Sequence, residues 1–152
     1  MPQITGTLDK KRALIDVGLQ PTILQIESVQ PFGSTQSMSV RPLRGLIDTG
    51  AQCTCVTRST AKLAGLRPRG KKRLGNVSNI ETHTAYSFVL GVWYSVDEGD
   101  ANNETKGYYG FEPVLGCDFK DNPDFDVLIG MDIISQGDFA TKRDGTFMWD
   151  LP

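Results

Sequence analysis

The chain has 152 residues, a formal net charge of −2, 39% hydrophobic and 22% charged residues. This composition is typical of a globular domain and excludes a disordered or fibrous chain. It gives no globally basic surface for nucleic acid, and no apolar run approaches the ~20 residues of a membrane-spanning helix. We therefore expect neither nucleic acid nor a membrane as a partner, and we expect a single domain over residues 1–152.

The cysteines and the first residues bear on the cellular compartment. The chain has three cysteines, an odd number, which favours reduced thiols over a disulfide framework. The first residues lack the charged segment and apolar run of a secretory signal. We therefore expect a cytoplasmic protein.

The first half of the chain is dominated by strand patterns. Apolar residues that alternate with polar ones, or short apolar runs, predict strands at the following positions: 13–19, 22–29, 43–47 and 53–56. Gln20 and Pro21 are expected to form the turn between the first two, and 31–37 a loop. A helix is predicted over 57–66, with Thr57 capping its start and Gly65 its end.

The second half continues the strand pattern. A basic cluster at 67–73 is interpreted as a solvated loop, and the polar, Gly-containing segment 97–110 as a long exposed loop. Strands are predicted over 77–96 and 125–129, a helical turn over 131–136, and a terminal hairpin over 139–149 that turns at Asp144-Gly145. The sequence therefore predicts a compact, mainly β domain with one or two short helices.

A short motif at the end of a predicted strand carries the chemistry. Asp48 directly follows an apolar run, where burial of an unpaired carboxylate would be costly. Gly50 permits a tight turn that presents backbone N–H groups to that carboxylate, and the hydroxyl of Thr49 can anchor the turn. This pattern is typical of a built site at the mouth of a sheet.

Together with a second motif, this segment resembles the retropepsins, the aspartic proteases of retroviral type. The two motifs are Leu46-Ile47-Asp48-Thr49-Gly50-Ala51 and Asp126-Val127-Leu128-Ile129-Gly130-Met131-Asp132-Ile133-Ile134. Their glycines lie 130 − 50 = 80 residues apart. The strand pair before the first motif and the Ile-Gly-x-Asp near the end most resemble the bacterial retropepsin-like proteins. The resemblance extends from about Pro21 to Trp149.

The resemblance implies an all-β, closed retropepsin-like barrel that is active as a C2 homodimer. In that family two chains each supply one aspartate, so Asp48 and its copy in the partner chain would form the catalytic dyad of an aspartic endopeptidase. Thr49, Gly50 and Ala51 would support the loop. In viral members the termini of both chains interleave, which makes 147–151 a candidate for that role.

The resemblance also implies supporting segments. Leu128, Ile129 and Gly130 would pack behind the loop, and Asp132 would be structural rather than a second catalytic carboxylate. The flap over a bound peptide best matches the following residues: Gly75, Asn76, Val77, Ser78 and Asn79. A plain exposed hairpin is the alternative for this segment. The partner would be a peptide or protein substrate.

Two alternatives compete with this interpretation. The same fold can serve as a catalytically silent dimerisation or protein-binding module. Separately, Cys53, Cys55, Cys117 and the only histidine, His83, have the donor types of a Cys₃His zinc site. We expect Cys53 and Cys55 to point to opposite faces of a strand and so not to share a metal. The thiols are interpreted as buried and inert, and no metal or cofactor is expected.

Overall fold

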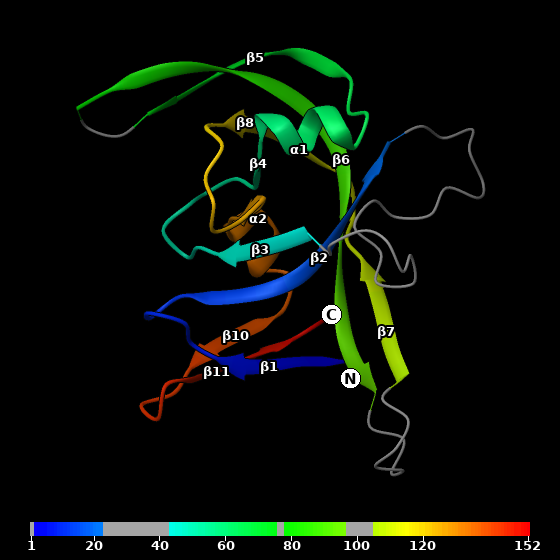
Figure 1. Cartoon of the computed structure of the whole chain (residues 1–152), viewed down its shortest axis with the longest axis vertical. Helices are drawn as coiled ribbons and strands as arrows, with labels where there is room; N and C mark the ends of the chain where they lie inside the picture. The colour runs from blue at the N-terminus through cyan, green and yellow to red at the C-terminus, as the bar shows by residue number, and fades with distance from the viewer. Residues whose placement is uncertain (1, 23–42, 76–77, 97–104) are drawn as a thin grey trace.

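The computed structural model describes residues 2–22, 43–75, 78–96 and 105–152, in which eleven strands and two short helices form (Figure 1). In chain order these are β1 Gln3–Thr7, β2 Ala13–Pro21, β3 Leu43–Ile47, β4 Cys55–Thr57, α1 Arg58–Leu63, β5 Pro68–Gly75, β6 Ile80–Val96, β7 Thr105–Gly110, β8 Val114–Phe119, β9 Val127–Ile129, α2 Met131–Ile134, β10 Asp138–Thr141 and β11 Thr146–Asp150. The expectation of a mainly β chain with one or two short helices is confirmed, with two helices in the described residues.

The strands form two sheets. The larger has the order β2-β3-β9-β4-β8-β6-β5, with β7 paired to β6, and β2 pairs with β6 as well as with β3. The smaller has the order β1-β11-β10. The long strand β6 connects the parts of the large sheet, because β2, β5, β7 and β8 all pair with it. The closed barrel and the C2 dimer stay predictions.

The core follows from the alternation in the sequence. Successive side chains of a strand point to opposite faces, so every second residue of β2 and β6 enters the same core. These residues are Ala13, Ile15, Val17 and Leu19 of β2 and Phe88, Leu90 and Val92 of β6. Trp149 of β11 is fully buried and stacks on Phe111 at a ring-centroid distance of 5.4 Å.

The two chain ends pair with each other within one chain (Figure 1). β11 is the central strand of the small sheet, with β1 antiparallel on one side and β10 antiparallel on the other. Both edges of β11 are therefore occupied, and Phe147, Trp149 and Leu151 are buried. The suggestion that 147–151 interleaves with a partner chain is wrong. The backbone of this segment already pairs with β1 and β10 of the same chain, and its apolar side chains are buried in the core of that chain.

Local signals in the sequence placed several elements correctly. β3 covers 43–47 as predicted. The hydroxyl of Thr57 accepts a hydrogen bond from the backbone N–H of Thr60 at 3.2 Å, as expected of a helix cap. Gly65 and Gly145 have positive φ angles of 68° and 85°, which suits glycine at the end of α1 and in the β10–β11 turn.

Several segments differ from the sequence prediction, including β1 and β8, where no strand was predicted. Pro21 ends β2 and pairs with Phe88 instead of forming a turn. The basic cluster belongs largely to β5, and the second part of the predicted loop 97–110 is β7. Apart from Thr22, the predicted strand 22–29 and the loop 31–37 lie outside the described residues. Within the described part, neither helix has the length and apolar character needed to cross a membrane.

Candidate active site

The turn after β3 fixes the position of Asp48. The backbone N–H of Asp48 donates to Ile129 O at 2.9 Å, so the residue starts from an anchored strand end. The N–H of Gly50 donates to Asp48 Oδ1 at 2.9 Å, and the N–H of Ala51 donates to Asp48 O at 3.2 Å. Asp48 is half-buried, whereas Thr49 and Gly50 are exposed. The loop therefore presents an oriented carboxylate close to the molecular surface.

The second motif lies directly beside the first. β9 sits between β3 and β4 in the sheet, parallel to β3 and antiparallel to β4. The N–H of Met131 donates to Ala51 O at 2.8 Å, and that of Asp132 donates to Gln52 O at 3.2 Å. A Cβ at Gly130 would lie 2.5 Å from the carbonyl carbon of Cys53, so only glycine allows this approach. The structure thus brings the residues of both motifs together.

A buried hydrogen-bond network connects the two segments. Thr54, which is fully buried, donates from its backbone N–H to Asp132 Oδ2 at 3.0 Å and from its hydroxyl to Asp132 Oδ1 at 2.7 Å. The same hydroxyl accepts from the N–H of Gly130 at 3.1 Å. Asp132 therefore makes structural contacts, in agreement with the sequence interpretation, whereas sequence reasoning missed Thr54.

Replacing Asp132 by asparagine is expected to lower the free energy of unfolding by about 1–2 kcal/mol. Asparagine keeps one acceptor for the N–H of Thr54, but its amide nitrogen cannot accept from the Thr54 hydroxyl, which loses its acceptor. Denaturant unfolding at a fixed protein concentration measures the change. Asp138→Asn is the matched control, because Asp138 is exposed on β10. Equal stability of both variants would contradict the network.

A groove opens beside the loop, under the hairpin of β5 and β6. Its volume is about 880 Å³, and its walls come from residues 50–55, β5, β8, β9 and α2. Gly50 and Ala51 form the edge next to Asp48, and Leu74 and Gly75 line the hairpin side. Leu128 also lines the groove, so it contributes to the surface as well as to the support predicted for it. Leu115 on β8 is 54% exposed there.

The predicted flap coincides with the tip of this hairpin, which extends from the rest of the large sheet (Figure 1). The pairing of β5 with β6 runs out to Gly75 opposite Ile80. Ser78 and Asn79 are exposed. Asn76 and Val77 lie outside the described residues. A hairpin is present where the sequence placed it, and its role as a flap stays a prediction.

The cysteines lie together, contrary to the sequence prediction. Cys53, Cys55 and Cys117 have their Sγ atoms within 4.8 Å of one another. The expectation that Cys53 and Cys55 point apart is wrong, because side chains two residues apart on an extended chain point to the same side. His83 is not in this cluster; its Nδ1 lies 3.7 Å from Asp118 Oδ1.

The thiols of this cluster do not have the properties of a catalytic nucleophile. Burial raises the pKa of Cys53, and Cys55 adds to this effect. The hydrogen bond with Cys117, followed by burial, raises the pKa of Cys55 far above its ordinary value. The nucleophile of a cysteine protease is a thiolate, which requires a lowered pKa. A cysteine-protease mechanism is therefore disfavoured.

Comparisons with known proteins agree with this geometry. The sequence model described as aspartyl protease matches residues 35–133, well over half of the chain. The chain therefore belongs to the aspartyl protease family. Its fold is retropepsin-like: it is similar to the crystal structure of a retropepsin-like aspartic protease from Rickettsia conorii, with a TM-score of 0.51 and 15% sequence identity over 98% of this chain and 90% of that chain. No curated protein matches the sequence.

Proposed function

We propose that the protein is an aspartic endopeptidase whose active site forms between two copies of the chain. The observation that carries the proposal is the Asp48 carboxylate, held by the N–H of Gly50 on a loop with an exposed tip, beside a groove under a hairpin. The chain contains one Asp-Thr-Gly triplet, so a dyad requires a second copy. The exposed Thr49 and Gly50 are the residues that such a copy would cover.

In the proposed mechanism, two Asp48 carboxylates share one proton, because like charges about 3 Å apart cannot both ionise easily. The ionised Asp48 takes a proton from a water, and the water oxygen attacks the carbonyl carbon of the scissile peptide bond. The protonated Asp48 donates a hydrogen bond to the carbonyl oxygen. Collapse of the tetrahedral intermediate breaks the C–N bond, and a proton from the dyad goes to the leaving nitrogen.

The groove supports a peptide as the substrate. Leu115 is 54% exposed on one wall, and Ile80 is 62% exposed at the tip of the hairpin, so both offer apolar surface to substrate side chains. The β5 arm would act as the flap and lie over the bound chain. A cytoplasmic location stays part of the proposal.

Peptide cleavage tests the proposed activity. We expect the purified protein to cleave members of a mixed peptide library, with the highest rate in mildly acid solution, because the dyad must carry one proton. A transition-state mimic directed at aspartic proteases should stop the reaction. Treatment with a thiol-blocking reagent, removed before the assay, should leave the pH profile of cleavage unchanged. A folded dimer that cleaves nothing across about pH 4–7 would favour the silent binding module.

The second expected result concerns protein concentration. Because each chain donates half of the site, the activity per unit mass should fall on dilution below the dimer dissociation constant. Peptide hydrolysis measured over a dilution series, alongside sedimentation of the same samples, checks this. A specific activity that stays constant while the sample becomes monomeric would contradict the shared site.

A further inference from the structure

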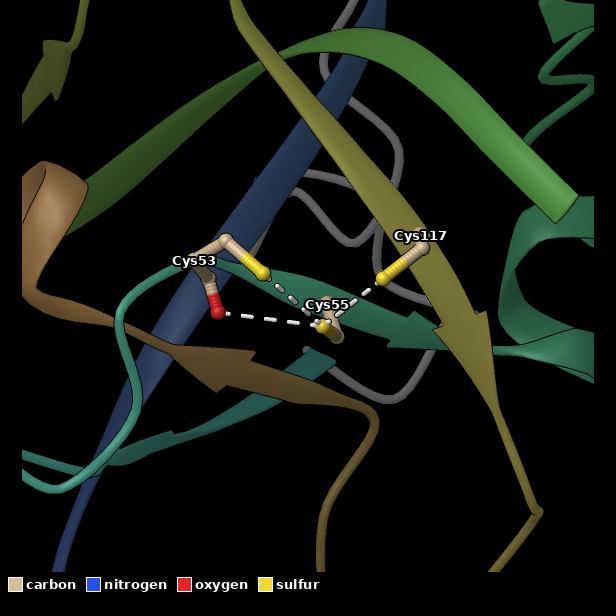
Figure 2. Close-up of side chains that lie close together, drawn as sticks. All are labelled: Cys53, Cys55 and Cys117. Carbon is tan, nitrogen blue, oxygen red and sulfur yellow. Dashed lines mark hydrogen bonds between the residues drawn. The ribbon is translucent and has the colours of Figure 1, made fainter. Parts of the chain in front are cut away.

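Three thiols converge at one point beside the groove (Figure 2). Cys55 of β4 lies directly opposite Cys117 of β8 in the parallel ladder, and Cys53 reaches the same point from the segment before β4. The Sγ atoms of Cys53 and Cys55 are 3.9 Å apart, and those of Cys55 and Cys117 are 3.3 Å apart. All three cysteines are free thiols.

Two of the three sulfur–sulfur distances are close to those around a thiophilic metal ion, and the third pair, Cys53–Cys117, lies within 4.8 Å. An ion with tetrahedral geometry and metal–sulfur distances of ~2.3 Å holds its sulfurs about 3.8 Å apart. The Cys53–Cys55 distance of 3.9 Å already has this value. The Cys55–Cys117 contact would have to open by about half an ångström, a rotamer-scale adjustment. If the three cysteines served only as small apolar core residues, their sulfur atoms would not need to lie together.

The surroundings of the cluster also suit a metal. Cys55 and Cys117 are buried and Cys53 is half-buried, so two ligands come from the core and one from the groove edge. Cys53 and Cys55 line the groove, which leaves a further coordination position open on that side. Lys72 on β5 lines the same groove, so a cationic side chain lies at the groove edge where Cys53 is. A cation close by would offset the net negative charge of a tris-thiolate complex.

We propose that Cys53, Cys55 and Cys117 form a binding site for one thiophilic d¹⁰ metal ion, Zn²⁺ or Cu⁺, at the edge of the groove. Thiolates are the ligands that both ions prefer. Each bound thiol releases its proton to solvent as its sulfur bonds to the ion, and no redox step is involved. The proposal does not depend on peptidase activity, because metal binding is measured directly.

Competitive metal titration of the fully reduced, metal-free protein tests the site. Zn²⁺ and, separately and without oxygen, Cu⁺ are titrated against a coloured chelator. We expect one equivalent of at least one ion to bind, with loss of thiol reactivity at the three cysteines and a rise in melting temperature. The ion with the higher affinity identifies the occupant. Failure of both ions to bind at one equivalent would overturn the proposal.

Single substitutions locate the ligands. Cys53→Ser and Cys117→Ser should each lower the metal affinity by more than the roughly 10- to 100-fold that loss of an outer-shell partner costs. Cys53 is half-buried, so its variant should fold even if Cys117→Ser does not. His83→Gln is the control and should bind like the unaltered protein. Unchanged affinity of a folded Cys53→Ser, or loss of affinity in His83→Gln, would overturn the three-thiol site.

Discussion

Replacing Asp48 by asparagine is expected to abolish peptide hydrolysis and leave the fold intact. Asparagine has nearly the same shape, and its amide oxygen can accept the bond from the N–H of Gly50 that Asp48 Oδ1 accepts at 2.9 Å. It cannot remove a proton from water at any accessible pH. Loss of general acid–base catalysis alone costs about 10²- to 10⁴-fold in rate. Initial rates on a cleaved peptide, with circular dichroism as the check on folding, measure the effect.

Mixing the Asp48→Asn chain with the unaltered chain extends this test to the dimer. Random pairing of equal amounts leaves about one quarter of the dimers with two aspartates. Activity should therefore fall below half of that of the unaltered protein at the same total concentration. Asp138→Asn, an exposed change of the same chemistry, should have no effect in either experiment. Retained cleavage by Asp48→Asn would contradict the aspartic mechanism. A mixture with half the rate of the unaltered protein would contradict the shared dyad, because independent sites give that value.

The sequence was most informative where structure depends on neighbouring residues. The strand 43–47, the Asp48 turn, the Thr57 cap and the Asp144-Gly145 hairpin each rest on residues within a few positions. In such cases the alternation of apolar residues, a positive φ angle at glycine or a side chain that bonds its own backbone decides the conformation. The family resemblance then related the two motifs, which local patterns alone do not connect.

Contacts between segments that are distant in the sequence could not be predicted from local sequence patterns. The bonds from Thr54 to Asp132 span 78 residues, and the Cys55–Cys117 contact spans 62. They depend on β9 lying between β3 and β4 and on β8 pairing with β4. The register of such strands depends on packing of the whole core and has no local signal.

Strand β7 was missed for a related reason. It lacks an apolar period because glycines and tyrosines from facing strands pack against each other. The ring of Tyr94 on β6 lies over Gly107, and the ring of Tyr108 lies over Gly91, where a Cβ would collide with it. An aromatic ring over a cross-strand glycine supplies apolar contact that the glycine itself lacks. Seen alone in the sequence, the glycines of β7 are typical of a loop.

Replacing Gly130 by alanine is expected to lower the free energy of unfolding by about 3 kcal/mol and to abolish hydrolysis. The backbone of Gly130 is extended, with φ −95° and ψ −179°, so alanine meets no conformational strain there. The cost is steric: the new Cβ would lie 2.5 Å from the carbonyl carbon and 2.6 Å from the carbonyl oxygen of Cys53. These are backbone atoms, which cannot rotate away, so the segment after Ala51 must move.

That movement reaches the proposed catalytic residue through short connections. Displacing Cys53 stretches the bonds from Met131 to Ala51 O and from Asp132 to Gln52 O, which fix the loop that begins at Asp48. Denaturant unfolding and peptide hydrolysis of the same preparation measure both effects. Gly110→Ala is the matched control, because a Cβ there would meet Val89 at an ordinary 3.6 Å. If both variants kept full stability and activity, close contact between β9 and the Cys53 segment would not be what positions Asp48.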